Sequence, residues 1–256
     1  MDLKILVTND DGINAIGIKK LAYSLKKLGK VIIVAPDRER SATGHAITMH
    51  QPLRVERVDF HDSDIDAWSI NGTPSDCVKI ALESILPQKP DIIVSGINNG
   101  PNLGTDVIYS GTVSAAIEGA IHNIPSIAMS VYGTKAKINY EGAAFFSCNL
   151  VQRALENKMP NNLVLNINFP SKNYDDIKGI KITELGIRKY ENSYDQRTDP
   201  MGRSYYWLSG SLIEISNSES SDVECVKSGY ISITPLHFDL TDYKYLNEMK
   251  KWNINI

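Results

Sequence analysis

The chain lacks the cysteine, apolar and basic stretches that mark several classes of protein. Its three cysteines, Cys77, Cys148 and Cys225, are too few and too scattered for a disulfide framework or a zinc knuckle. No apolar run approaches the length of a transmembrane helix, and the apolar residues before Thr8 are too few for a signal peptide. Lys and Arg never form a run longer than two, and the formal net charge is −3. We therefore expect a cytoplasmic protein that binds neither a membrane nor a nucleic-acid polymer.

Several catalytic and nucleotide-binding motifs are also missing. The sequence has no Gly-x-x-x-x-Gly-Lys-Ser/Thr loop, no Gly-x-Gly-x-x-Gly run, no His-Glu-x-x-His pair and no Gly-x-Ser-x-Gly elbow. The histidines are dispersed, and we expect most of them to be structural or surface residues: His45, His50, His61, His122 and His237. Only His237 is a candidate for an acid–base or interface role.

What is present is an alternation of short apolar strands and amphipathic helices. This alternation predicts an α/β fold, a Rossmann-like, three-layer, doubly wound and mostly parallel sheet, over residues 1–170. The composition, 42% hydrophobic and 22% charged, is that of an ordinary globular protein. We expect strands at 5–8, 31–35, 91–95, 126–131 and 163–167, and helices at 16–28, 75–86, 112–122 and 141–155.

The amino-acid composition changes in residues 171–256, which we expect to form a C-terminal extension of the same structural unit. Pro, Asn, Asp, Tyr and Ser dominate residues 190–221, with β-like pieces at 205–208 and 212–215. This segment is either an extended hairpin that serves as an oligomerisation arm or a surface loop, and the sequence favours neither. A returning strand at 231–234 and a closing helix at 242–252 follow.

The first candidate site is the polar turn after the first strand. Asp10 and Asp11 are adjacent carboxylates, which repel each other unless a cation joins them. Gly12 permits the sharp turn that would bring both to one side. Ligands that are all oxygen suit Mg²⁺, Mn²⁺ or Ca²⁺. A solvated turn that caps the following helix explains the same residues equally well.

The second candidate follows the strand at 31–35. Four consecutive charged residues, 37–40, precede Ser41 and Thr43, either of which could supply a hydroxyl ligand. The two arginines of the charged run could bind phosphate. Taken alone, this segment is better explained as a solvated loop.

The third candidate, residues 95–106, gives the strongest local signal. It holds three asparagines and three glycines in one long connection, which is unusual in a compact domain. It runs into residues 109–116, a hydroxyl- and glycine-rich entry to a helix, where backbone amides can hold a phosphate. All three candidates follow predicted parallel strands, so the fold would gather them along one rim of the sheet.

Taken together, these motifs resemble the SurE (survival protein E) family. The resemblance covers nearly the whole chain, and it rests on five motifs in order: Val7 to Gly12; Ala35-Pro36 with Ser41 to Gly44; Asn71 to Val78; Ser95 to Asn98 and on through Thr112; and Ile231 to Leu236. The resemblance implies a metal-dependent nucleotidase acting on nucleoside 5′- and 3′-monophosphates, in some members also on short polyphosphate. It also implies a homodimer or homotetramer with an extended C-terminal hairpin.

The resemblance carries specific roles onto this chain. One divalent ion, Mg²⁺ or Mn²⁺ with Ca²⁺ possible in crystals, is expected on Asp10, Asp11, Ser41 and Asn98. Catalysis is expected to depend on Asp10, Asp11 and Asn98. The residues expected to bind the phosphate are Asn9, Asn102, Ser110, Gly111 and Thr112.

In the expected mechanism, the ion binds a phosphate oxygen and activates a water that attacks phosphorus. An aspartyl-phosphate intermediate is disfavoured, because the phosphatases that form one use an Asp-x-Asp spacing and the acids here are adjacent. A signalling receiver domain is disfavoured by length. A non-catalytic nucleotide or metal sensor on the same fold stays open.

Overall fold

The structure is a computed structural model that describes residues 3–60, 62, 64–133, 138–192, 194–252 and 254. His61 therefore lies outside the described residues. A nine-stranded sheet runs through the centre, in the order β3-β4-β2-β1-β5-β6-β7-β13-β8. Six neighbouring strands are parallel: β4 (Asp66–Ile70), β2 (Lys30–Pro36), β1 (Lys4–Thr8), β5 (Ile92–Asn99), β6 (Ser126–Tyr132) and β7 (Val164–Pro170).

The edges of the sheet depart from the parallel pattern. On one side β3 (Val55–Arg57) runs antiparallel to β4. On the other, β13 (Ile231–Leu236) runs antiparallel to β7 and carries β8 (Ile180–Ile182) as a parallel neighbour. The last quarter of the chain thus returns to the same sheet.

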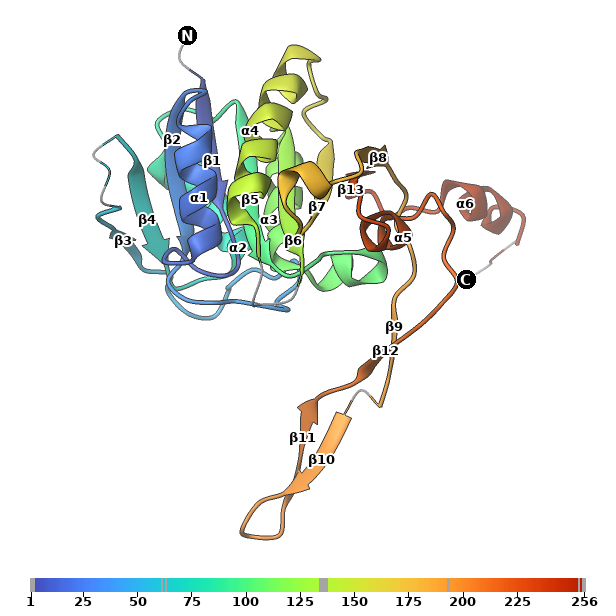
Figure 1. Cartoon of the computed structure of the whole chain (residues 1–256). Helices are drawn as coiled ribbons and strands as arrows, with labels where there is room; N and C mark the ends of the chain where they lie inside the picture. The colour runs from blue at the N-terminus through green and yellow to red at the C-terminus, as the bar shows by residue number, and fades with distance from the viewer. Residues whose placement is uncertain are drawn as a thin grey trace.

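Helices cover both faces of the sheet, which gives three layers (Figure 1). The first face carries α1 (Ile16–Leu25) and α4 (Tyr140–Glu156), packed on the side chains of Ile5 and Val7. The second carries α2 (Pro74–Ile80) and α3 (Gly111–Ile121). There α2 packs on Leu6, the residue between Ile5 and Val7 in the sequence. Successive residues of a strand point to opposite faces, so a strand buried on both sides reads as a continuous apolar run.

The order of the strands creates a switch point between β1 and β5. From β1 the chain winds outward through β2 to β4, and it then starts again at β5 and winds the other way through β6 to β7. The crossover connections leave β1 and β5 in opposite directions, so a crevice opens at the carboxyl ends of these two strands. The turn after β1 and the end of β5 therefore flank the usual ligand position of this fold.

The arm is the clearest addition to this core. Two antiparallel ladders, β9 (Lys189–Glu191) with β12 (Ser211–Ile213) and β10 (Tyr194–Thr198) with β11 (Ser204–Leu208), extend away from the sheet as one long hairpin (Figure 1). Of the two sequence interpretations, the extended hairpin is confirmed and the surface loop is wrong. The remaining helices are short: α5 (Asp222–Lys227) and α6 (Tyr243–Met249), the π-helical continuation of α2, η1 (Ala81–Ile85), and the 3₁₀-helices η2 (Gly104–Tyr109) and η3 (Tyr174–Asp176).

The predicted doubly wound, mostly parallel sheet is confirmed, and the differences are local. No local pattern predicted β3, β4, β8 or α5, which are short or lack a clear apolar period. The first helix ends at Leu25 rather than at residue 28. Strand β5 continues to Asn99, so Asn98 lies on the strand rather than in a connection after it. None of the helices in the described part of the chain is long and apolar enough to cross a membrane.

Candidate functional site

Asp10 lies at the switch point, against the beginning of α3. The residue is 4% exposed, and its Oδ1 accepts a hydrogen bond of 2.6 Å from the hydroxyl of Thr112. Gly111, the first residue of α3, packs so closely that a Cβ there would lie 2.8 Å from Cβ of Asp10 and 3.0 Å from its Oδ2. The fold therefore brings Asp10, Gly111 and Thr112 together from positions a hundred residues apart.

Asp11 faces the end of β5, on the other side of the crevice. Its Oδ2 accepts a hydrogen bond of 3.0 Å from the backbone N–H of Asn99. The neighbouring Asn98 donates from its side-chain nitrogen to the carbonyl of Gly100, 2.9 Å away. This bond orients the amide of Asn98, so its side-chain oxygen is the atom that could bind a metal ion. The two aspartates thus connect β1 to α3 and to β5.

The electrostatics of the pair disfavour two negative charges in the metal-free protein. Burial is the main cause that raises the pKa of Asp10 to about 6, and the charge of Asp11 adds to it against the lowering effect of Thr112. Burial also raises the pKa of Asp11, where the N–H of Asn99 opposes the shift and the charge of Glu39 adds to it. A bound cation would remove this penalty, because an opposite charge favours the ionised form.

The loop after β2 crosses the crevice, and we call residues 37–48 the strap. The N–H of Arg40 donates to the carbonyl of Asp10 over 2.7 Å, so the strap passes directly over the aspartate turn. Gly12 allows this approach: its φ is +95°, and a Cβ there would lie 2.9 Å from the backbone of Arg38. Ser41 is exposed beside this contact and donates to Glu39 over 2.7 Å. The strap therefore places Ser41 directly after the residue that contacts Asp10.

The residues expected to hold phosphate divide into two groups. Ser110 caps α3, since its hydroxyl oxygen accepts the N–H of Val113 over 3.1 Å, and with Gly111 and Thr112 it forms the helix end at Asp10. Asn9, by contrast, is fully buried, and its side-chain nitrogen donates to the carbonyl of Gly12 over 2.9 Å. Asn9 thus shapes the aspartate turn.

Asn102 belongs to a buried amide cluster that fixes the loop between β5 and α3. Its N–H donates to Oδ1 of Asn168 over 2.8 Å, and its side-chain nitrogen donates to Ser130 over 2.7 Å. Its carbonyl accepts the side-chain nitrogens of both Asn166 and Asn168, at 2.8 and 2.9 Å. This cluster anchors the loop to β6 and β7. The asparagines of the loop did not reveal this structural role in the sequence.

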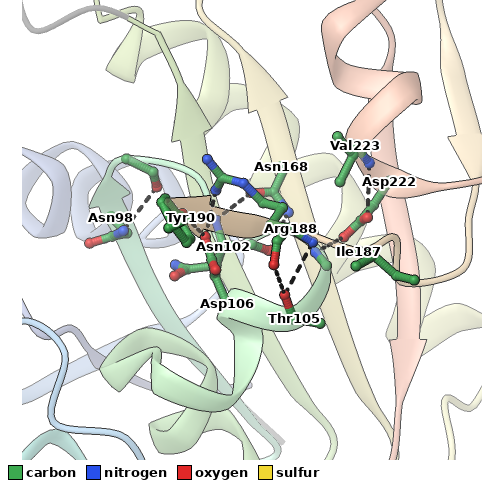
Figure 2. Close-up of polar contacts among 12 residues, drawn as sticks. Asn98, Asn102, Thr105, Asp106, Asn168, Ile187, Arg188, Tyr190, Asp222 and Val223 are labelled. Carbon is green, nitrogen blue, oxygen red and sulfur yellow. Dashed lines mark hydrogen bonds and ion pairs between the residues drawn. The ribbon is translucent and has the colours of Figure 1, made fainter. Parts of the chain in front are cut away.

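The same loop is fastened to the stem of the arm (Figure 2). Asp222 is fully buried and accepts the N–H groups of Gly104 and Gly186, each over 2.8 Å. Asp106 forms an ion pair of 2.7 Å with Arg188 and accepts a hydrogen bond of 2.6 Å from the hydroxyl of Tyr190. The loop that leads to Ser110 is therefore held between the sheet and the arm.

The donor set fits a hard divalent cation better than a softer ion such as Zn²⁺, which prefers nitrogen and sulfur ligands. In the part of the chain that the structure describes, no three residues among His, Cys, Asp and Glu are grouped as metal ligands. Two carboxylates with neutral oxygens remain, the ligand chemistry that Mg²⁺, Mn²⁺ and Ca²⁺ accept. Three buried oxygens near the switch point, on Thr8, Asn9 and Ser95, also have no hydrogen-bond partner. Buried polar atoms are normally paired, so this edge of the sheet is built to receive further polar groups.

Sequence reasoning missed the groups that support the site from outside it. Glu39 was visible in the charged run, but only the fold brings its charge close to Asp11. His45 was grouped with the structural histidines, and it bonds Glu118 of α3 over 2.7 Å. His237 directly follows β13 and is exposed. No spacing rule connects such residues, because their contacts join segments far apart in the chain.

Comparison with known proteins places the chain in a family. The family model described as "Survival protein SurE" matches residues 5–192. The chain is 54% identical, over 98% of its length and 99% of the relative's, to a protein of Alkaliphilus metalliredigens (strain QYMF) named 5′-nucleotidase SurE. It is 52% identical to a protein of the same name from Carboxydothermus hydrogenoformans (strain ATCC BAA-161 / DSM 6008 / Z-2901), over 98% of this chain and 96% of that one.

A solved structure agrees with the sequence comparisons. The crystal structure of the SurE protein from Aquifex aeolicus superimposes with a TM-score of 0.85 at 42% sequence identity, covering 98% of this chain and all of that one. Fold, motif order and sequence identity agree over nearly the whole length. The chain therefore belongs to the SurE family.

Proposed function

We propose that this chain is a divalent-metal-dependent nucleotidase that hydrolyses nucleoside 5′- and 3′-monophosphates, and also short polyphosphate. The names of the relatives, 5′-nucleotidase SurE, support the 5′-nucleotidase activity. The observation that carries the proposal is the contact between the buried Asp10 carboxylate and the first turn of α3. A cation beside Asp10 and a phosphate at the helix end would then be immediate neighbours.

Four side chains would hold one divalent ion: Asp10, Asp11, Ser41 and Asn98. Two charged and two neutral oxygens suit Mg²⁺ or Mn²⁺, and Ca²⁺ takes the same donors. When bound, such an ion neutralises charge on the phosphate and lowers the pKa of a coordinated water. The buried position of Asp10 serves this role, since removal of water strengthens electrostatic interactions.

The beginning of α3 would bind the phosphate group. The backbone N–H groups of the first turn that Ser110 does not cap, together with the positive end of the helix dipole, favour an anion there. Thr112 shares its hydroxyl with Asp10, so it sits between the carboxylate and the phosphate position. Asn102 would add a side-chain donor, and Asn9 would act by shaping the aspartate turn. Water would attack phosphorus in line, and the nucleoside oxygen would leave with a proton from solvent.

We further propose that the protein assembles as a homodimer or homotetramer through the arm. The outer ladder exposes several large side chains, among them Tyr194, Tyr206, Trp207 and Leu208, each more than half exposed. Apolar and aromatic surface of this kind on a protruding hairpin is typical of an interface between subunits.

A phosphate-release screen tests the proposal. The protein, stripped with EDTA, would be reloaded with Mg²⁺, Mn²⁺ or Ca²⁺ and assayed on 5′- and 3′-nucleoside monophosphates and on tripolyphosphate. We expect release with Mg²⁺ or Mn²⁺ and none after stripping. Undiminished release without metal would overturn metal dependence. Nucleotide binding without any release would favour the sensor function instead.

A further inference from the structure

The strap is fastened at several points on its way across the site. After Arg40 contacts Asp10, the N–H of Gly44 donates to the carbonyl of Tyr109 over 3.1 Å. Beyond it, the carbonyl of Ala46 accepts the hydroxyl of Thr73 over 2.7 Å. Between these two backbone contacts, His45 makes the strap's one charged contact with α3 among the described residues. Ser41, a proposed ligand, lies four residues before it.

The partner of His45 is a buried acid. Nε2 of His45 lies 2.7 Å from Oε2 of Glu118, whose side chain is 5% exposed, while the His45 side chain is 29% exposed. Nε2 of His122 lies 3.3 Å from the other oxygen of Glu118, and Lys79 of α2 adds positive charge nearby. Burial alone would raise the pKa of Glu118, but the hydrogen bond and charge of His45, with His122 and Lys79, lower it overall. Glu118 is therefore ionised at neutral pH.

The two histidines do different structural work, although they share one carboxylate. His122 is four residues after Glu118 and directly follows α3, so its contact with Glu118 stays at the end of that helix. His45 belongs to the strap, so its bond joins two separate parts of the site. Glu118 is on the helix whose first turn holds Thr112 against Asp10. The bond of His45 therefore fixes the strap relative to the phosphate end of the site.

The path from His45 back to Ser41 is short and folded. The hydroxyl of Thr43 donates to the carbonyl of Arg40 over 2.9 Å, which closes a turn around Ser41. Ala42 and Gly44 have φ values of 55° and 57°, so the chain reverses here rather than extending. Because the turn between them is tight, a displacement of His45 should also displace Ser41.

We propose that His45 is a positioning residue for the metal ion: by binding Glu118 it holds the strap where the Ser41 hydroxyl can act as a ligand beside Asp10. This inference rests on the proposed metal site. A hydrogen bond to a charged group changes an equilibrium constant by roughly 10- to 150-fold. The backbone contacts of Gly44 and Ala46 retain part of that restraint, so we expect a five- to tenfold effect at the metal.

The test compares His45→Ala with His45→Gln and with His122→Ala as the matched control. The protein would be stripped with EDTA, and its Mn²⁺ affinity would be measured by isothermal titration calorimetry, with metal-free Tm recorded alongside. We expect His45→Ala to raise the Kd for Mn²⁺ five- to tenfold. His45→Gln, whose amide can donate to Glu118, should recover most of the affinity. His122→Ala should stay within twofold of the wild type whatever its Tm.

Three results would overturn the proposal. The first is an unchanged Kd in both His45 variants. The second is an equal loss of affinity in His122→Ala, since the effect would then come from the stability of α3. The third is a loss in His45→Gln as large as in His45→Ala. If His45→Ala fails to fold, His45→Asn, whose amide is too short to reach Glu118, replaces it in the same comparison with His45→Gln and His122→Ala. A wild-type protein that binds no Mn²⁺ would instead refute the proposed metal site itself.

Discussion

Replacement of Asp10 by asparagine should stabilise the metal-free protein and abolish its response to metal. In the folded chain burial raises the pKa of Asp10 to about 6, whereas an unfolded Asp titrates at about 3.9. The folded state thus holds the proton more tightly, and its stability falls as pH rises from about 4 to about 6. At about 1.4 kcal/mol per pH unit, the ionised Asp10 costs about 3 kcal/mol above that window. Asparagine removes this cost and keeps an oxygen that can accept the bond from Thr112.

The measurement is thermal unfolding in EDTA at pH 8 and at pH 4 to 5, then in Mn²⁺. For a chain of this size we expect Asp10→Asn to raise Tm by on the order of 6–12 °C at pH 8. The gain should shrink as pH falls, because the wild-type carboxyl becomes protonated. Mn²⁺ at 100 times its Kd should stabilise the wild type by about 2.7 kcal/mol and leave the variant unchanged. Asp175→Asn, which removes the same charge from an exposed position, should behave as wild type. A metal-free variant less stable than wild type at pH 8, yet stabilised by Mn²⁺, would refute the reasoning.

The remaining predictions concern close backbone approaches and the arm. Gly12→Ala should lower the free energy of unfolding by about 2 kcal/mol, and Tm by about 4–8 °C, because of its φ of +95° and the 2.9 Å contact with Arg38; an unchanged Tm would count against that turn. Gly111→Ala, whose Cβ would lie 3.0 Å from Oδ2 of Asp10, should lower kcat at least about tenfold with little change in Tm; full activity would argue against a site at this contact. Deletion of residues 190–212 should leave a monomer by light scattering, and an unchanged oligomer would exclude the arm as the interface.

The sheet could be predicted because its strands are buried on both faces. Residues 31–35 form an uninterrupted apolar run, and serine is the only polar residue type in 126–131. Glycine or proline follows or precedes most of the helices. β3, by contrast, has three exposed residues, and β8 also lacks a buried apolar face. Such edge strands depend on pairing with a neighbour that is distant in sequence. No local period reveals them, because the fold supplies their stabilisation.

The site could be predicted in part, for a related reason. Adjacent aspartates after a strand and asparagines near another strand end place a polar rim on a doubly wound sheet. The sequence could not show which of those residues meet. Thr112 bonds Asp10 across 102 positions, and Asn99 bonds Asp11 across 88. It also assigned Asn102 only to ligand binding, whereas its backbone and side chain both join the buried amide cluster.

The motifs that define the family do not all act at the site. Within residues 71–78, Thr73 and Asp76 form a reciprocal cap at the start of α2, and Asp76 also binds the N–H and the hydroxyl of Thr48 at the end of the strap. The motif at 231–236 is β13, which closes the sheet beside β7. These two motifs stabilise the structure around the site rather than contribute residues to it. One fastens the far end of the strap, and the other completes the sheet whose edge carries the aspartates.

The strap therefore contacts both a motif at the site, the aspartate turn, and a motif that stabilises its surroundings, the cap of α2. It begins at β2, passes the aspartate turn at Arg40, is held to α3 by His45, and ends at the cap of α2 through Thr48. Each contact is polar and directional, whereas the core beneath is apolar. A site for a charged ligand needs its groups fixed before the ligand arrives, since rearrangement of dipoles during binding would weaken the interaction. A loop that is pinned to three helix and strand ends meets that requirement, although every residue in it lies outside regular structure.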